Sequence, residues 1–250
     1  VARTAVPDGD NRMTGIIVQA RMGSQRLPGK SLLPLAGKPL LWHVLTRCAQ
    51  ASAAQHTVLA TGVGQENDPL AALAAELGIA CFRGHDTDLA QRFHDCAAEY
   101  GITTVVRVCA DNPLVHPGEL DRLIAHHMAS GEDYSCNVVP FMGNGYPDGI
   151  GGQAFPARHL ASLLQESANP SHREHMVTFF TDQPQRFRCG SPACPREFAR
   201  PDIRLDINTP AEYEFIARLF AELWSPERPL TMREIIPWCD AQRAAGRVPY

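Results

Sequence analysis

The stretch GIIVQARMGSQRLPGK, residues 15–30, decides the fold class. It begins with a short apolar run bounded by turn-forming residues, which predicts a buried strand of a parallel sheet over about 15–20. A polar loop rich in glycine follows directly. Ligands of open α/β sheets bind at the carboxyl ends of the strands, so this loop is the first place to look for a site.

An alternation of strands and helices continues along the first half of the chain. This order predicts an α/β fold in which a mixed, mostly parallel sheet is flanked by helices. In the second predicted helix, Asn67 or Asp68 is the expected cap. The helices are predicted over 40–50, 67–77 and 87–100, and the further strands over 56–62, 79–82 and 103–110.

The second half of the chain is less regular. Short apolar segments separated by turn residues predict a small α+β flap, inserted at about 130–200. One more strand is predicted over 204–207, followed by a helix that Thr209 caps together with Glu212. Residues 1–14 are polar and aperiodic and predict a disordered leader, which leaves 15–250 as a single domain.

The composition argues against several classes of protein. With 250 residues, 44% of them hydrophobic, the chain can bury one sizeable core. Its net charge of −4 argues against a nucleic-acid partner, which needs a basic surface. No apolar run approaches the roughly 20 residues of a membrane helix. The opening VARTAVPDGDNRM lacks the apolar centre of a secretory signal, so we expect no membrane partner and a cytoplasmic location.

Three fixed cations lie close together in the loop after the first strand. Arg21, Arg26 and Lys30 alternate with glycines that let backbone amides approach an anion. Arginine grips phosphate through two nitrogens and lysine acts as a point charge, and each charge-assisted bond contributes about 1.5–3 kcal/mol. The loop matches neither the P-loop nor the dinucleotide fingerprint. A solvated basic loop is the alternative, but the position after a buried strand favours a triphosphate site.

Several motifs together resemble one family, the cytidylyltransferases typified by CMP-sialic acid and CMP-KDO synthetases. Within it, the likeness is greatest to the branch of the spore-coat polysaccharide biosynthesis protein F. The resemblance implies a GT-A/Rossmann-like nucleotidyltransferase fold, CTP as the donor, Mg²⁺ as the cofactor and a possible homodimer. The motifs are IIVQARMGSQRLPGKSLLPLAGKPLLWHV (16–44), FRG (82–84), VVRVCADNPL (105–114), YPDG (146–149), SHREHMVTF (171–179) and RLDINTPAEYE (204–214).

The resemblance also implies which residues hold the nucleotide. Arg21 and Lys30 match triphosphate contacts of the family and, with Asp111, form the expected catalytic set. Arg107 is predicted to share a strand face with Cys109 and Asp111, so it reaches either the nucleotide or a core carboxylate. The full expected nucleotide set is Gln19, Ala20, Arg21, Met22, Gly23, Ser24, Arg26, Lys30 and Arg107.

A magnesium site is expected beside this loop. Mg²⁺ takes one or two carboxylates and completes its shell with phosphate oxygens and water. Asp111 ends the fourth strand and matches the metal-binding aspartate of the family. Asp206 and Asn208 lie two apart and so face the same way on the predicted strand. Either of them is the second ligand, and a helix-capping role for Asn208 remains an alternative.

The acceptor is expected to bind near the flap. Lys38, Asp148, Arg173 and His175 are the candidate acceptor contacts, Arg173 because a guanidinium is the natural partner of an anion. The predicted function is transfer of CMP from CTP to a small acidic acceptor, an acidic sugar or a phosphonate or phosphate, with release of pyrophosphate. A GT-A glycosyltransferase that uses a nucleotide-sugar in polysaccharide biosynthesis is the alternative, and a non-catalytic nucleotide-binding protein is a second one.

Overall fold

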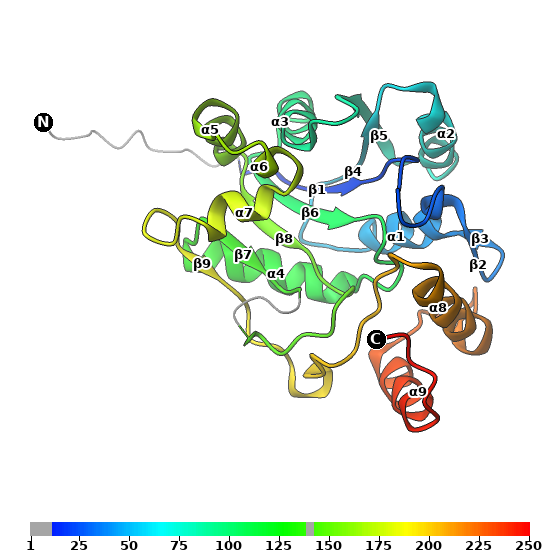
Figure 1. Cartoon of the computed structure of the whole chain (residues 1–250). Coiled ribbons are helices and arrows are strands. Elements are labelled where there is room, and N and C mark those ends of the chain that lie inside the picture. The colour runs from blue at the N-terminus through cyan, green and yellow to red at the C-terminus, as the bar shows by residue number, and fades with distance from the viewer. Residues whose placement is uncertain (1–11, 139–142) are drawn as a thin grey trace, which may run out of the picture.

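In the computed structural model, the described residues 12–138 and 143–250 form a seven-stranded sheet in the order β5-β4-β1-β6-β8-β7-β9 (Figure 1). Strands β5, β4, β1 and β6 run parallel to one another, whereas β8 runs antiparallel to both of its neighbours. The predicted mixed, mostly parallel sheet is confirmed. Its strands are β1 (Thr14–Gln19), β4 (His56–Gly62), β5 (Ala80–Gly84), β6 (Thr104–Cys109), β7 (Tyr134–Cys136), β8 (Gln153–Pro156) and β9 (Cys189–Gly190).

Helices cover both faces of the sheet because each buried strand is apolar on both sides. In β1, Ile16 and Val18 point into one core and Ile17 points into the other. The first core takes side chains from α1 (Leu40–Cys48), α2 (Asp68–Glu76), α4 (Pro117–Ser130), α8 (Pro210–Leu223) and α9 (Met232–Ala244). The second takes side chains from α3 (Leu89–Glu99), α5 (Arg158–Glu166) and α7 (Met176–Thr181), and the short α6 (Ser171–Glu174) precedes α7.

Short elements complete the chain between these layers. Strands β2 (Pro34–Leu35) and β3 (Lys38–Pro39) form a separate antiparallel hairpin. The described residues also contain three 3₁₀ turns: η1 (Lys30–Leu32), η2 (Gln65–Asn67) and η4 (Arg196–Phe198). None of the described helices combines the length and the apolar character needed to cross a bilayer.

The region expected as a flap is joined to the main sheet. Strand β8 pairs with β6 through Thr104 and Pro156, and β7 and β9 follow it outward. Residues 139–142 of this region lie outside the described residues. The segment 204–207, expected as a strand, is extended chain with one bridge, between Asp148 and Arg204, so that expectation was wrong.

The start of the ordered body also differs from the expectation. Strand β1 begins at Thr14, and the Met13 carbonyl accepts hydrogen bonds from the amides of Thr103 and Thr104. Met13 and Thr14 thus belong to the folded body, and the predicted leader over 1–14 extends too far. Residues 1–11 of that leader lie outside the described part of the chain. The capping box of Thr209 and Glu212 at α8 is present as predicted.

Candidate functional site

The loop after β1 is held in place by a residue from a distant helix start. The Met22 amide donates to the Asn67 side chain at 3.0 Å. Asn67, predicted as a helix cap, makes no side-chain capping bond, because its oxygen is used by this contact. Gly29 adopts φ 68°, in the left-handed region that favours glycine, directly before η1. The loop thus turns sharply at Gly29, with Lys30 starting the next element.

Lys30 joins three segments that are far apart in the sequence. Its ammonium donates to Asp111 Oδ2 at 2.8 Å, to the Ile207 carbonyl at 2.9 Å and to Asn208 Oδ1 at 3.3 Å. A lysine has three donors, so all of them are used. Carboxylate, carbonyl and amide oxygens therefore converge on one point, which is the donor chemistry that a hard cation prefers.

A second group of contacts surrounds Asn208. Its oxygen also accepts from Arg26 at 2.8 Å, and its amide nitrogen donates to Asp206 Oδ2 at 2.5 Å. Asp206 and Asn208 thus lie together, although no strand holds them. The other Asp206 oxygen, Oδ1, is buried and has no hydrogen-bond partner among the described residues. A buried oxygen without a hydrogen-bond partner destabilises the folded state unless a ligand or an ion pairs with it.

Arg107 lies at the floor of the same region. Its guanidinium donates to Gln19 Oε1 at 2.7 Å and to Gln153 Oε1, on β8, at 2.5 Å. No carboxylate of the described chain forms an ion pair with it, so the alternative of a core acid partner was wrong. Since both partners are neutral amides, the full positive charge of Arg107 remains for an anion.

These side chains open into a cavity of about 560 Å³. Its wall brings together loop residues, the end of β6, the start of α3 and the end of α6, as expected for the carboxyl edge of a parallel sheet. Of the expected site residues, it contains Gln19, Ala20, Arg21, Ser24, Arg26, Lys30, Arg107, Asp111, His175 and Asn208. It also contains six residues outside the expected site set: Gln25, Thr87, Leu89, Arg92, Cys109 and Glu174.

The cavity does not include several expected residues. Lys38 lies over the Trp42 ring, 5.5 Å from its centroid, on the hairpin. Arg173 donates to Asp88 Oδ2 at 2.5 Å and to the Leu164 carbonyl at 3.0 Å, so it ties α6 to α3 and α5. Neither side chain lines the cavity, and the acceptor roles of Lys38 and Arg173 stay predictions.

Four further expected residues, Met22, Gly23, Asp148 and Asp206, do not line the cavity either. Met22 packs against the core through its side chain, and a Cβ at Gly23 would meet no atom within 4 Å. Asp148 lies behind the wall, where its backbone pairs with Ile203 and Leu205. The expected nucleotide contacts of Met22 and Gly23 and the expected acceptor contact of Asp148 stay predictions.

Arg92 is the most informative of the residues that the sequence did not reveal. It is 3% exposed, and it donates to the carbonyls of His85 and Asp86 while its Nε has no partner in the described chain. Burial lowers the pKa of Arg92 to about 10, and the Arg21 cation lowers it further. A buried guanidinium facing another cation indicates a site for a strong anion.

Arg21 forms one ion pair, with Glu174 at 3.3 Å. Both side chains are about half exposed, at 46% and 57%. Exposed pairs of this kind contribute at most about 1 kcal/mol. Replacement of the Glu174 carboxylate on Arg21 by a phosphate would therefore cost little free energy.

Two buried carboxylates, those of Asp148 and Asp206, interact with Asp111, which lines the cavity. Burial raises the pKa of Asp148 to about 6, and the neighbouring Asp206 carboxylate adds to the rise. Burial likewise raises the pKa of Asp206, and Asp111 contributes repulsion. No three His, Cys, Asp or Glu side chains of residues 12–138 and 143–250 gather closely enough to hold a metal by themselves. The arrangement fits Mg²⁺, which needs only one or two carboxylates when phosphate supplies the rest.

Asp148→Asn is expected to stabilise the protein at neutral pH when no metal is present. The folded-state pKa of about 6 lies above the roughly 3.9 of an unfolded chain, so the folded state binds more protons between these values. Stability therefore falls as pH rises through that window and stays lower above it. The variant keeps the oxygen that accepts from the Gly149 amide and removes the charge. We expect the free energy of unfolding to rise by about 1–2 kcal/mol near pH 7.5.

Denaturant unfolding in the presence of a chelator, near pH 4 and near pH 7.5, measures this effect. Asp95→Asn, on the surface of α3, is the matched control and is expected to show little change. A variant at position 148 that is less stable than the wild type near pH 7.5 would contradict the account.

A mostly parallel sheet with a cationic loop and convergent oxygens at one edge is typical of α/β nucleotide-binding proteins. The family model for cytidylyltransferases matches residues 15–228. The chain belongs to the cytidylyltransferase family, and membership indicates an enzyme of the nucleotidyltransferase type. The predicted resemblance is confirmed.

Individual relatives agree with this assignment. The chain is 32% identical over 218 residues to the spore coat polysaccharide biosynthesis protein SpsF of Bacillus subtilis, covering 85% of this chain and 88% of that protein. It is 35% identical over 112 residues to a 3-deoxy-manno-octulosonate cytidylyltransferase of Geobacter sulfurreducens, 44% of this chain and 43% of that enzyme.

Solved structures give the same result for the fold. A cytidylyltransferase from Leptospira borgpetersenii superposes with a TM-score of 0.83 at 27% identity, over 93% of this chain and 96% of that one. CMP:2-keto-3-deoxy-manno-octonic acid synthetase, solved in complex with CTP, gives a TM-score of 0.62 at 17% identity, over 84% of this chain and 99% of that one. The second likeness supports the fold alone.

Proposed function

We propose that this protein transfers CMP from CTP to a small acidic acceptor, with release of pyrophosphate and with Mg²⁺ as cofactor. The observation that carries the proposal is the convergence of Lys30, Asp111 and Asn208 at the edge of a cavity that Arg21, Arg26 and Arg92 also line. The cations suit a triphosphate, and the oxygens that lie beside them suit its metal. Family membership and the relatives named above supply cytidine as the base.

The reaction is a substitution at the α-phosphorus of CTP. An acceptor oxygen forms a bond to that phosphorus, the bond to the bridging oxygen breaks, and pyrophosphate leaves with the electron pair. If the acceptor oxygen is a hydroxyl, its proton passes to solvent or to a nearby base. Arg21, Arg26 and Lys30 hold the β- and γ-phosphates and stabilise the charge that grows on the leaving group. Positioning in line with the leaving oxygen provides the remaining acceleration.

The metal belongs to the oxygen-rich side of the cavity. Asp111 would hold it, with Asp206 or the Asn208 oxygen as the second ligand. When bound, Mg²⁺ neutralises charge on the phosphates and polarises the reacting phosphoryl group. The unpartnered Asp206 oxygen and the raised pKa of Asp206 support this assignment, because a nearby cation relieves both.

The acceptor side is assigned to the part of the cavity near α3 and α6. His175 and Thr87 line it there, and Arg92 supplies a buried positive charge. A small acid suits this charge, since an anion repays the desolvation of the guanidinium. SpsF is named for polysaccharide biosynthesis, so an acidic sugar is the first acceptor class to test.

A thermal-shift panel tests the donor. The four ribonucleoside triphosphates are compared with Mg²⁺ and with a chelator, because a ligand that binds only the native state raises the melting temperature. We expect the largest rise with CTP and Mg²⁺, and a smaller one without the metal. Acidic sugars, phosphonates and phosphates are then screened for pyrophosphate release from CTP. Equal shifts with all four triphosphates, or release from another triphosphate only, would contradict the proposal.

A further inference from the structure

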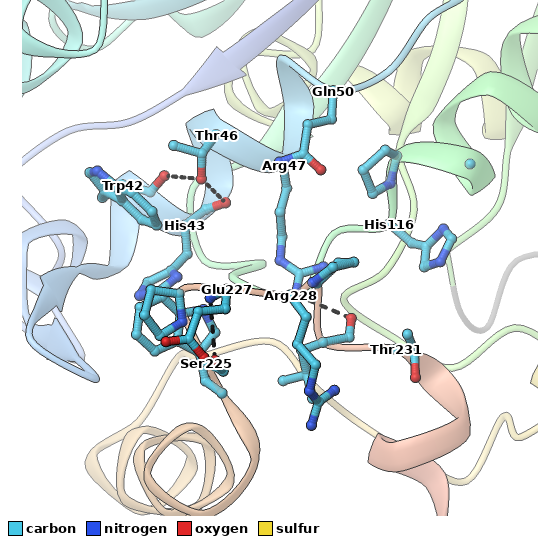
Figure 2. A pocket seen from close by; sticks show the side chains of 16 residues that line it. Trp42, His43, Thr46, Arg47, Gln50, His116, Ser225, Glu227, Arg228 and Thr231 are labelled. Carbon is cyan, nitrogen blue, oxygen red and sulfur yellow. Dashed lines mark hydrogen bonds between the residues drawn. The ribbon is translucent and has the colours of Figure 1, made fainter.

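A second cavity, of about 470 Å³, lies away from the nucleotide site and shares none of its lining residues. It is bounded by α1, by the start of α4 and by the loop 224–231 between α8 and α9 (Figure 2). Its walls come from segments that are far apart in the sequence, so its shape is a property of the folded chain.

Arg47 is the central charged group of this cavity. It extends from α1 between Ser225 on one side and His116 on the other (Figure 2). Its guanidinium donates only to the carbonyls of Val115, at 3.5 Å, and Leu230, at 3.4 Å, both at the long end of hydrogen-bond geometry. Throughout the described chain, no carboxylate forms an ion pair with it.

Arg47 therefore carries a charge that the protein does not neutralise. Burial lowers its pKa to about 10, so it stays protonated at neutral pH. A partly buried guanidinium without a carboxylate costs free energy, because neither water nor an anion fully solvates it. An anion in the cavity would remove that cost.

The other polar groups of the cavity do not occupy the Arg47 guanidinium, which remains available to an anion. The Glu234 carboxylate pairs with Arg228 at 2.5 Å, and the Glu227 carboxylate accepts from the Ser225 hydroxyl at 3.0 Å. Neither carboxylate pairs with Arg47. His116 Nδ1 is buried and has no partner in the described residues. Burial lowers the pKa of His116, so its ring is neutral and can donate a hydrogen bond.

The apolar part of the wall is aromatic. Trp42 and Trp224 line it together with Pro226, Pro229 and Leu230. Large flat side chains beside a cation that no carboxylate pairs with are typical of sites for small organic anions, in which polar groups fix one end of the ligand and apolar groups cover the rest.

We propose that this cavity is a second ligand site, which binds a small organic anion with its carboxylate or phosphate on Arg47 and its flat apolar body beside Trp42 and Trp224. The site is distinct from the CTP cavity and does not depend on the proposed reaction.

Tryptophan fluorescence reads out occupancy directly. The sequence contains three tryptophans, and two of them line the cavity. The third, Trp238, donates to Glu222 at 2.7 Å and packs on Phe215 instead. The full chain is titrated with phenyl phosphate and with benzoate, in parallel by calorimetry, and with phenol and inorganic phosphate as the separate halves of the ligand. The two anionic probes distinguish a phosphate from a carboxylate ligand.

We expect saturable binding of at least one aromatic anion and weaker binding of phenol and of inorganic phosphate. Arg47→Gln should weaken it by at least about tenfold, since a charge-assisted bond is lost. Arg47→Lys should retain part of it, and Lys30→Met, in the CTP cavity, should leave it unchanged. Thermal melts show whether each variant is folded.

Three results would overturn the proposal. One is the absence of heat and of a fluorescence change with both aromatic anions. Another is unchanged affinity in a folded Arg47→Gln variant. The third is loss of binding in Lys30→Met, which would place the probe in the CTP cavity.

Discussion

Asp111→Asn is expected to reduce kcat/KM for pyrophosphate release from CTP by roughly 10²-fold or more. The substitution keeps the shape of the side chain and an oxygen for Lys30, which lies 2.8 Å from the carboxylate. It removes the negative charge that would anchor the metal, and about 3 kcal/mol of transition-state stabilisation corresponds to two powers of ten in rate.

The acceptor that supports wild-type turnover is used in this assay, and calorimetry of CTP binding with and without Mg²⁺ is run beside it. We expect Asp111→Asn to lose most of the metal-dependent part of CTP binding. Asp95→Asn on α3 serves again as the matched control, with activity near that of the wild type. Activity of the Asp111 variant within twofold of the wild type would mean that the metal is held elsewhere.

Lys30→Met is expected to reduce kcat/KM by about 10²–10³-fold. The methionine keeps the length of the stem but deletes a cation that contacts Asp111, Ile207 and Asn208. The triphosphate loses a charge-assisted contact, and two neighbouring acidic and amide groups lose their common partner. Lys30→Arg is not expected to restore full activity, since a planar guanidinium does not fit a point where three acceptors converge.

The chain offers a matched control for this experiment. Lys38 lies over Trp42 and does not line the cavity that contains Lys30. Lys38→Met should leave kcat/KM within about twofold of the wild type, because an exposed charge at this distance is screened. Equal losses in both variants would indicate a general effect of charge and would argue against a defined contact of Lys30.

The sequence predicts the first half of the fold well because its elements are long and regularly spaced. Strand β4 has the predicted bounds, 56–62, and β1 differs by one residue at each end. Strands β7 and β9 were expected as part of a separate flap, and segments of three and two residues carry no sign that they extend the main sheet. Helix α9 was not predicted, and Pro237 inside it interrupts the helical pattern.

The site was predictable where chain order determines position. The loop after β1 and Asp111 after β6 meet because the carboxyl ends of parallel strands share one edge of the sheet. The sequence could not reveal the side chains whose direction depends on a distant partner. Arg173 turns to Asp88. Arg92 reaches the cavity from α3, a contact that depends on packing between helix and loop.

A crystal structure of the protein with CTP and Mg²⁺ tests the central claim most directly. The account predicts the triphosphate in the cavity lined by Arg21, Arg26 and Lys30, with the metal bound by Asp111 and by Asp206 or Asn208. A bound CTP whose phosphates and metal contact neither Lys30 nor Asp111 would contradict it.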